Sequence, residues 1–142
     1  MTPLKDTRSL LHVLKSELTF LDAGGYARWG SSPHARMSLP LVFEESPACP
    51  NFNDATRSIA CRDCALMQLV PLRYQMRPVP CRHIPLNEVG ETLDTLYRWG
   101  TIDDLNPIFR RWLVHTIDLL ERKQAHKKWL RDQSVYDAAE LT

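Results

Sequence analysis

Four cysteines are the residues of this chain with the clearest potential for chemistry. They occur in the order Cys49, Cys61, Cys64 and Cys81, with His83 close behind, and the spacing is Cys-x11-Cys-x2-Cys-x16-Cys-x-His. A Cys-x2-Cys turn brings two sulfurs to one centre, and its backbone amides can donate hydrogen bonds to the thiolates. Because a lone cysteine flanks this pair on each side, the spacing predicts a four-cysteine metal site.

Zinc is the metal that we favour for this site. Four thiolates and one divalent ion carry a net charge of about −2, and residues 57–82 supply five arginines against one aspartate. Arg57, Arg62 and Arg82 are therefore candidates to surround the ligands and balance their charge. The order of lone cysteine, pair and lone cysteine is also similar to that of plant-type [2Fe–2S] ferredoxins, which makes an iron–sulfur cluster the alternative cofactor. Those proteins differ in their shorter spacing before the pair and their β-rich fold.

Other roles are open for the same side chains. His83 could replace Cys49 as a ligand, but side chains two residues apart in extended chain diverge by roughly 6–7 Å. The cysteines could also be small buried residues of the core, or Cys61 and Cys64 could form a redox pair. A site closed by four cysteines leaves zinc no open coordination position, which favours a structural role over catalysis.

The hydrophobic pattern predicts the elements that must position these residues. Leucines recur at three- and four-residue intervals, which predicts an amphipathic helix over residues 4–22 with Gly24 at its end. Eight of the ten prolines fall within residues 33–85, together with all four cysteines, so this segment is predicted to be a long loop region. Residues 39–45 and 69–74 could form one short β-hairpin there. We expect metal binding to replace the hydrophobic core that such a segment lacks.

Two further helices are predicted after the proline-rich segment. The first spans residues 87–99 and starts at Asn87, and the second spans residues 107–131 and starts at an Asn-Pro pair that supplies a cap and a first turn. The first half of the last helix has an apolar face that packs, whereas its second half is polar and is predicted to project. The sequence therefore indicates a single domain over residues 1–142, mainly α, with three helices and a central loop region clamped by the metal.

The end of the last predicted helix is a candidate interaction surface. It combines cations with one aromatic side chain, and its members are Arg122, Lys123, Lys127, Lys128 and Trp129. Such a surface could bind a partner protein, a second copy of the chain or the phosphates of a nucleic acid. Basic residues in the last turns of a helix also complement its dipole, which is the simpler explanation of the charge.

Composition and missing motifs narrow the function further. The 142 residues include 18 Lys and Arg against 17 Asp and Glu, so there is no overall basic field. The sequence contains no GxGxxG, P-loop, GxSxG or HExxH motif, and we expect a protein that is not an enzyme. No apolar run suits a signal peptide or a membrane span, which predicts a cytoplasmic protein without a membrane partner.

The hypothesis that results is a small zinc-binding interaction or adaptor module. The alternatives are an iron–sulfur protein in electron transfer or redox sensing, and a nucleic-acid-binding regulator that uses the basic helix.

Overall fold

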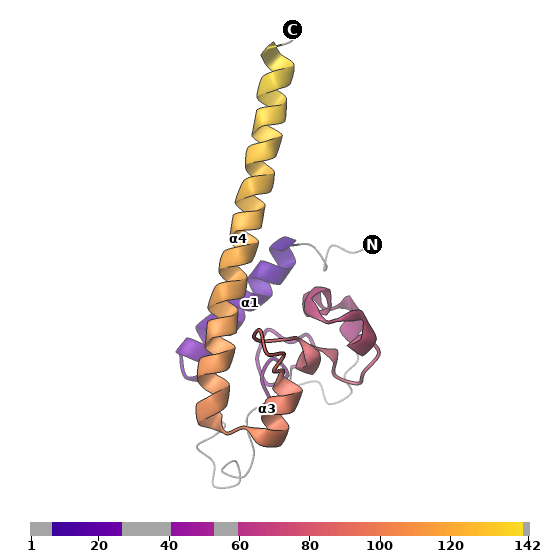
Figure 1. The fold of residues 1–142 in the computed structure, drawn as a ribbon, viewed down its shortest axis with the longest axis vertical. Helices are drawn as coiled ribbons and strands as arrows, with labels where there is room; N and C mark the ends of the chain where they lie inside the picture. Colours follow the sequence, from indigo (N-terminus) through magenta and orange to yellow (C-terminus); the bar gives the residue numbers. More distant parts are fainter. Residues whose placement is uncertain (1–6, 27–40, 53–59, 141–142) are drawn as a thin grey trace.

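The protein is a small helical body from which one long helix projects (Figure 1). The computed structural model describes residues 7–26, 41–52 and 60–140. Within these residues there are three α-helices and four short 3-10 helices, and there is no β-strand. The α-helices are α1 (Thr7–Asp22), α3 (Leu93–Trp99) and α4 (Ile102–Glu140); the 3-10 helices are η3 (Cys61–Asp63), η4 (Ala65–Leu69), η5 (Leu72–Tyr74) and η6 (Pro80–His83). The predicted mainly α class is confirmed.

Helix α1 follows the leucine pattern of the sequence. Leu10, Leu11 and Leu14 are buried on the face that packs against α4. The helix ends at Asp22, and Gly24 then takes a φ of +79°, a left-handed conformation that glycine adopts without steric cost. The predicted helix and its glycine end therefore agree with the structure, while residues 4–6 of the prediction lie outside the described residues.

Helix α3 is shorter than predicted, because its N-cap is Thr92 rather than Asn87. The Thr92 and Thr95 hydroxyls each accept a hydrogen bond from the backbone N–H of the other residue, at 3.2 and 2.9 Å, which forms a capping box. Asn87 instead closes the preceding turn, where its side-chain oxygen accepts from the Glu91 N–H at 3.1 Å and Gly90 has a φ of +83°.

Helix α4 begins earlier and ends later than predicted. Thr101 and Asp104 cap its start: the Asp104 carboxylate accepts from the Thr101 N–H at 2.9 Å, and the Thr101 hydroxyl accepts from the Asp104 N–H at 3.3 Å. Pro107 lies inside the helix close to this start, where its missing N–H removes one intrahelical hydrogen bond. No glycine or proline follows residue 131 to end the helix, which continues to Glu140.

The central segment forms part of the core, contrary to the expectation that metal would replace a core there. Phe43, Met67 and Ile84 are at least nine-tenths buried, together with Val42, Ala65, Leu66, Val70 and Leu86. The Phe43 ring meets the rings of Phe109 and Trp112 of α4 edge-on, at centroid distances of 5.2 and 6.1 Å. The segments proposed for a hairpin hold turns and 3-10 helices where they are described, because the prolines among them remove backbone donors from any ladder.

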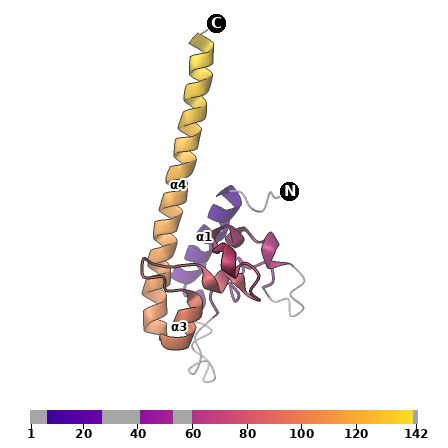
Figure 2. The same cartoon turned by 45° about the vertical axis from the view of Figure 1, so that its right-hand side comes forward.

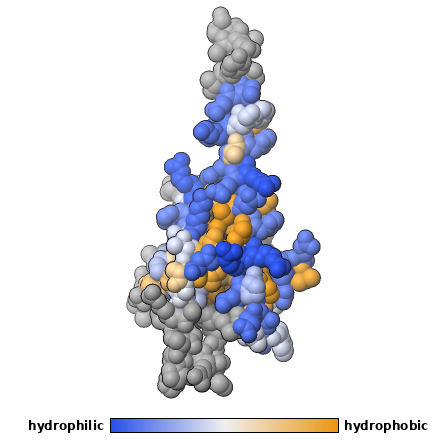
Figure 3. Space-filling view, turned by 90° about the vertical axis from the view of Figure 1, so that its left-hand side faces the viewer, coloured by the Kyte–Doolittle hydropathy of each residue, from blue (hydrophilic) through white to orange (hydrophobic). Residues whose placement is uncertain are grey.

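The second half of α4 leaves the body. Beyond Leu120 the described side chains are exposed, apart from the half-buried Gln124, and Figures 1 and 2 show this part of the helix standing clear of the other elements. In Figure 3 the projecting part is largely hydrophilic, while hydrophobic residues gather on the body. The prediction that this half projects is confirmed. None of the described helices is both long and apolar enough to cross a membrane.

Candidate metal centre

The four cysteines come from three separate turns and line one small cavity. Cys49 belongs to the loop 41–52, Cys61 and Cys64 belong to η3 and the residue after it, and Cys81 belongs to η6. The cavity has a volume of about 30 Å³, and its other walls include apolar side chains of the core such as Phe43. A space of roughly 10–15 Å³ on this measure admits one water-sized sphere. The cavity therefore has room for a single ion.

Each of the four cysteines begins a tight turn. Its carbonyl oxygen accepts a hydrogen bond from the N–H three residues ahead, at 2.9 Å for Cys49, 3.0 Å for Cys61, 3.1 Å for Cys64 and 3.5 Å for Cys81. The Cys64 sulfur also accepts a hydrogen bond from the backbone N–H of Leu66. Amides that point at sulfur in this way are a usual feature of metal-binding knuckles.

The thiols influence one another electrostatically. Burial raises the pKa of the Cys81 thiol well above its ordinary value, and the Glu44 carboxylate and the other three cysteines raise it further. Burial likewise raises the pKa of Cys64; the hydrogen bond from Leu66 opposes this shift, while Cys49 and Cys61 add to it. A cation held among the sulfurs would favour the thiolates and reverse this trend.

The sulfurs do not form a finished coordination shell. Among the residues described, no three His, Cys, Asp or Glu side chains converge closely enough to hold a metal ion. Tetrahedral zinc needs Zn–S distances of about 2.3 Å, which places neighbouring sulfurs about 3.8 Å apart. Metal binding would therefore require the turns that carry the cysteines to draw together.

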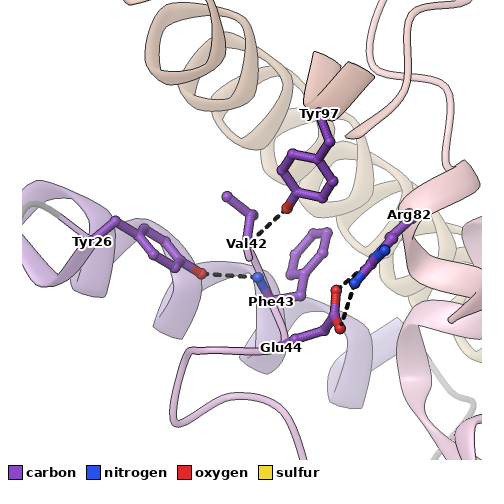
Figure 4. A network of polar contacts seen from close by, with 6 residues as sticks. All are labelled: Tyr26, Val42, Phe43, Glu44, Arg82 and Tyr97. Carbon is purple, nitrogen blue, oxygen red and sulfur yellow. Dashed lines mark hydrogen bonds and ion pairs between the residues drawn. The ribbon is translucent and has the colours of Figure 1, made fainter. Parts of the chain in front are cut away.

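An ion pair connects the loop of Cys49 to the turn of Cys81 (Figure 4). The Arg82 guanidinium donates to both carboxylate oxygens of Glu44, at 2.8 and 3.1 Å, and stands 5.5 Å from the centre of the Tyr97 ring. The Tyr97 hydroxyl in turn accepts a hydrogen bond from the Val42 N–H at 2.7 Å. Burial raises the pKa of Tyr97, and the hydrogen bond to Glu44 raises the pKa of Arg82.

Tyr26 fixes Phe43, the residue that follows Val42 in the loop 41–52. The Tyr26 hydroxyl accepts from the Phe43 N–H at 2.9 Å and donates to the carboxylate of Glu17 on α1. Phe43 has a φ of +69°, an uncommon conformation for a residue with a side chain, so these contacts fix a strained turn. Burial raises the pKa of Glu17, against the opposing effect of the Tyr26 and Ser46 hydroxyls. The other Glu17 oxygen is buried without a hydrogen bond among the described residues.

The other residues predicted to lie near the metal differ in their exposure and in their distance from the cavity. Arg82 lies beside Cys81 and is paired with Glu44, whereas Arg62 is exposed on η3. Arg57 lies outside the described residues. His83 is not among the residues that line the cavity, and its ring stacks on Tyr74 at a centroid distance of 4.7 Å.

The residues predicted for the interaction surface are all exposed on α4, and some of them line a cleft. Arg122 pairs with Asp118 one turn earlier at 3.0 Å. Lys123, Lys127 and Lys128 line a cleft between α4 and α1. Trp129 lies outside that lining, half exposed, with its ring 6.1 Å from that of His126. Three of the five residues therefore line the cleft, and Arg122 and Trp129 are exposed outside its lining.

Sequence reasoning missed the residues that fix the loop 41–52. Glu17 had a signal, because it lies on the leucine face of α1, seven residues after Leu10 and three after Leu14, where a carboxylate needs a buried partner. No sequence signal pointed to Glu44 or Tyr97, because Arg82 lies 38 residues from Glu44 and Val42 lies 55 residues from Tyr97 along the chain.

The chain matches no known protein family, no curated protein and no solved structure, so its own geometry is the guide to its function.

Proposed function

We propose that this chain is a small interaction module in which Cys49, Cys61, Cys64 and Cys81 bind one zinc ion. The observation that carries the proposal is that all four cysteines, from turns far apart in sequence, line one ion-sized cavity. Two further features support it: each cysteine begins a tight turn, and an amide already points at the Cys64 sulfur. Closing the shell around zinc would convert binding energy into order of the central segment.

We favour a single zinc ion over the iron–sulfur alternative because the spacing before the Cys61–Cys64 pair is longer than that of plant-type ferredoxins. Zinc also accepts four thiolates without a redox change, in keeping with a role in structure rather than electron transfer.

The turn between Cys64 and Cys81 supplies a surface for a partner. Leu72 and Met76 are 83% and 95% exposed. Between them Tyr74 is flanked by the guanidinium groups of Arg73 and Arg77, at 4.9 and 5.7 Å from the ring centre. Exposed apolar side chains close to aromatic and arginine side chains are typical of protein-binding sites. Metal binding would hold this turn, which we name the η5 turn (72–77), in a fixed position.

Metal analysis of the full chain tests this proposal. Protein purified under reducing, oxygen-free conditions is expected to contain one zinc per chain, and cobalt substitution should give the absorption of a tetrahedral thiolate site. Cys64→Ser should lose the metal and expose the central segment to proteolysis while α4 remains helical by circular dichroism. Arg98→Ala, an exposed change on α3 outside the lining of the cavity, is the control and should keep the zinc.

Three outcomes would contradict the zinc proposal. Iron with matching acid-labile sulfide would establish the cluster instead. A wild-type protein that binds neither metal would leave the cysteines as core residues. Full zinc content and unchanged proteolysis in Cys64→Ser would show that the cavity is not the binding site.

A further inference from the structure

A basic cleft lies between α1 and the projecting part of α4. Figures 1 and 2 both show the N-terminal end of α1 diverging from α4. It has a volume of about 990 Å³. None of the four cysteines lines this cleft, so its charge and shape do not depend on the metal.

The charged residues that line this cleft are all cations in the described part of the chain. They are Arg8, Lys15, Lys123, Lys127, Lys128 and Arg131, with His12 beside them. Lys15 is paired with Glu121 at 2.7 Å, and none of the described lining residues is acidic. Five positive charges therefore face this space in a protein whose net charge is only +1.

The helix dipole does not explain these cations. The dipole acts within the last turn of a helix, and α4 continues to Glu140, nine residues beyond Arg131. Lys123, Lys127 and Arg131 instead follow one another at four-residue intervals, where like charges destabilise a helix. An anionic partner would offset this repulsion.

The cleft also has helical geometry and an apolar contact point. Arg8 and Lys15 are seven residues apart on α1, and Lys123 and Arg131 are eight apart on α4, so each row of charge extends about 10–12 Å. Leu11 is 5% exposed, so Leu130, which is 48% exposed, is the accessible leucine in the described lining of the cleft. Two facing helices with cations on both walls and an exposed leucine on one of them form a groove that a third helix can complete.

The geometry points to an acidic amphipathic helix of a partner protein as the occupant of this cleft. Its leucine-type face would contact the exposed Leu130, and its carboxylates would pair with the cations that have no acidic partner in the described lining, on both walls. Single-stranded nucleic acid fits less well, because such sites stack bases on aromatic rings and the described lining contains no Phe, Tyr or Trp. A duplex presents its phosphates on a convex surface, which does not enter a groove between two helices.

Peptide binding to the full chain tests the inference. The probe is a fluorescent synthetic helix of about 20 residues with leucine at the a and d positions, glutamate at the e and g positions and alanine at the others. Fluorescence anisotropy at low and near-physiological salt should show binding that weakens as salt rises. The same peptide with lysine in place of glutamate, and one with serine in place of leucine, should bind weakly or not at all.

Charge reversal locates the binding site. Lys123→Glu with Lys127→Glu should weaken binding of the acidic peptide by about tenfold or more, because two attractive contacts become repulsive. Arg111→Glu, an exposed arginine of the same helix outside the cleft, is the matched control and should leave affinity unchanged. Circular dichroism should show the same helix content in all three proteins.

The inference is overturned by any of three results. The first is that the acidic peptide does not bind. The second is that the charge reversals in the cleft change the affinity for the peptide no more than Arg111→Glu does. The third is that a short single-stranded RNA, or a short DNA duplex, binds more tightly than the peptide at the same salt concentration. Cys64→Ser should bind the acidic peptide as tightly as the wild type does, because no cysteine lines the cleft. The zinc proposal and the peptide proposal can therefore fail independently of each other.

Discussion

The ion pair between Glu44 and Arg82 is expected to respond unequally to loss of its two members. The Glu44 side chain is 9% exposed, whereas that of Arg82 is 30% exposed. In Arg82→Met the carboxylate stays buried without its two charge-assisted hydrogen bonds, which costs about 3–5 kcal/mol of unfolding free energy. In Glu44→Leu the guanidinium can still reach water and the face of Tyr97, and the cost is about 1–2 kcal/mol.

Urea unfolding followed by far-UV circular dichroism, at a fixed zinc concentration, measures these free energies. The double variant should be more stable than Arg82→Met alone, because an apolar pair of similar volume removes the buried charge altogether. Arg98→Met breaks the exposed pair with Asp94, at 3.4 Å, and is the control, with an expected change of about 0.5 kcal/mol or less. The reasoning is refuted if Glu44→Leu destabilises as much as Arg82→Met, or if both equal the control.

Further predictions concern the contacts around Phe43. Tyr26→Phe should lower the unfolding free energy by about 2–4 kcal/mol, since both Glu17 and the Phe43 N–H lose the hydroxyl that they share; a change under half of this in urea unfolding would count against it. Burial raises the pKa of Glu17 above its ordinary 4.5, so the native state holds this proton more tightly than the unfolded state, and stability gains from protonation as pH falls through the raised pKa toward 4.5. Wild type should therefore gain stability relative to Glu17→Gln between pH 7 and pH 4.5, and parallel pH profiles for the two proteins would show that the carboxyl is not perturbed. Phe109→Ala should cost about 3–5 kcal/mol by thermal or urea unfolding, because this fully buried ring contacts both Phe43 and Trp112.

Local signals in the sequence determined the helical class and the body of each helix. The leucine spacing of α1 and the apolar face of α4 act over three or four residues, and the structure follows them. The helix starts depended on competing caps. Thr92 with Thr95 and Thr101 with Asp104 form reciprocal hydrogen bonds, which the isolated Asn87 and the Asn-Pro pair do not offer to a helix.

Only the tertiary structure decided what surrounds the cysteines. The spacing of the cysteines predicted that the four thiols share one site. It did not predict the contacts of Glu44 with Arg82 and of Val42 with Tyr97, which join residues 38 and 55 positions apart. No local periodicity encodes contacts of that kind, because they depend on how the loop 41–52 packs between the helices. The burial of Phe43 against α4 has the same origin and explains why a proline-rich segment contributes to the core.

The basic cleft shows the same division between sequence and structure. The sequence alone determined that the end of α4 is cationic and projects. Which of those cations face Arg8 and Lys15 depends on the angle at which α1 crosses α4, and that angle is set by side-chain packing between residues about a hundred positions apart. Charge is a property of composition, whereas a charged groove exists only after two helices have packed together.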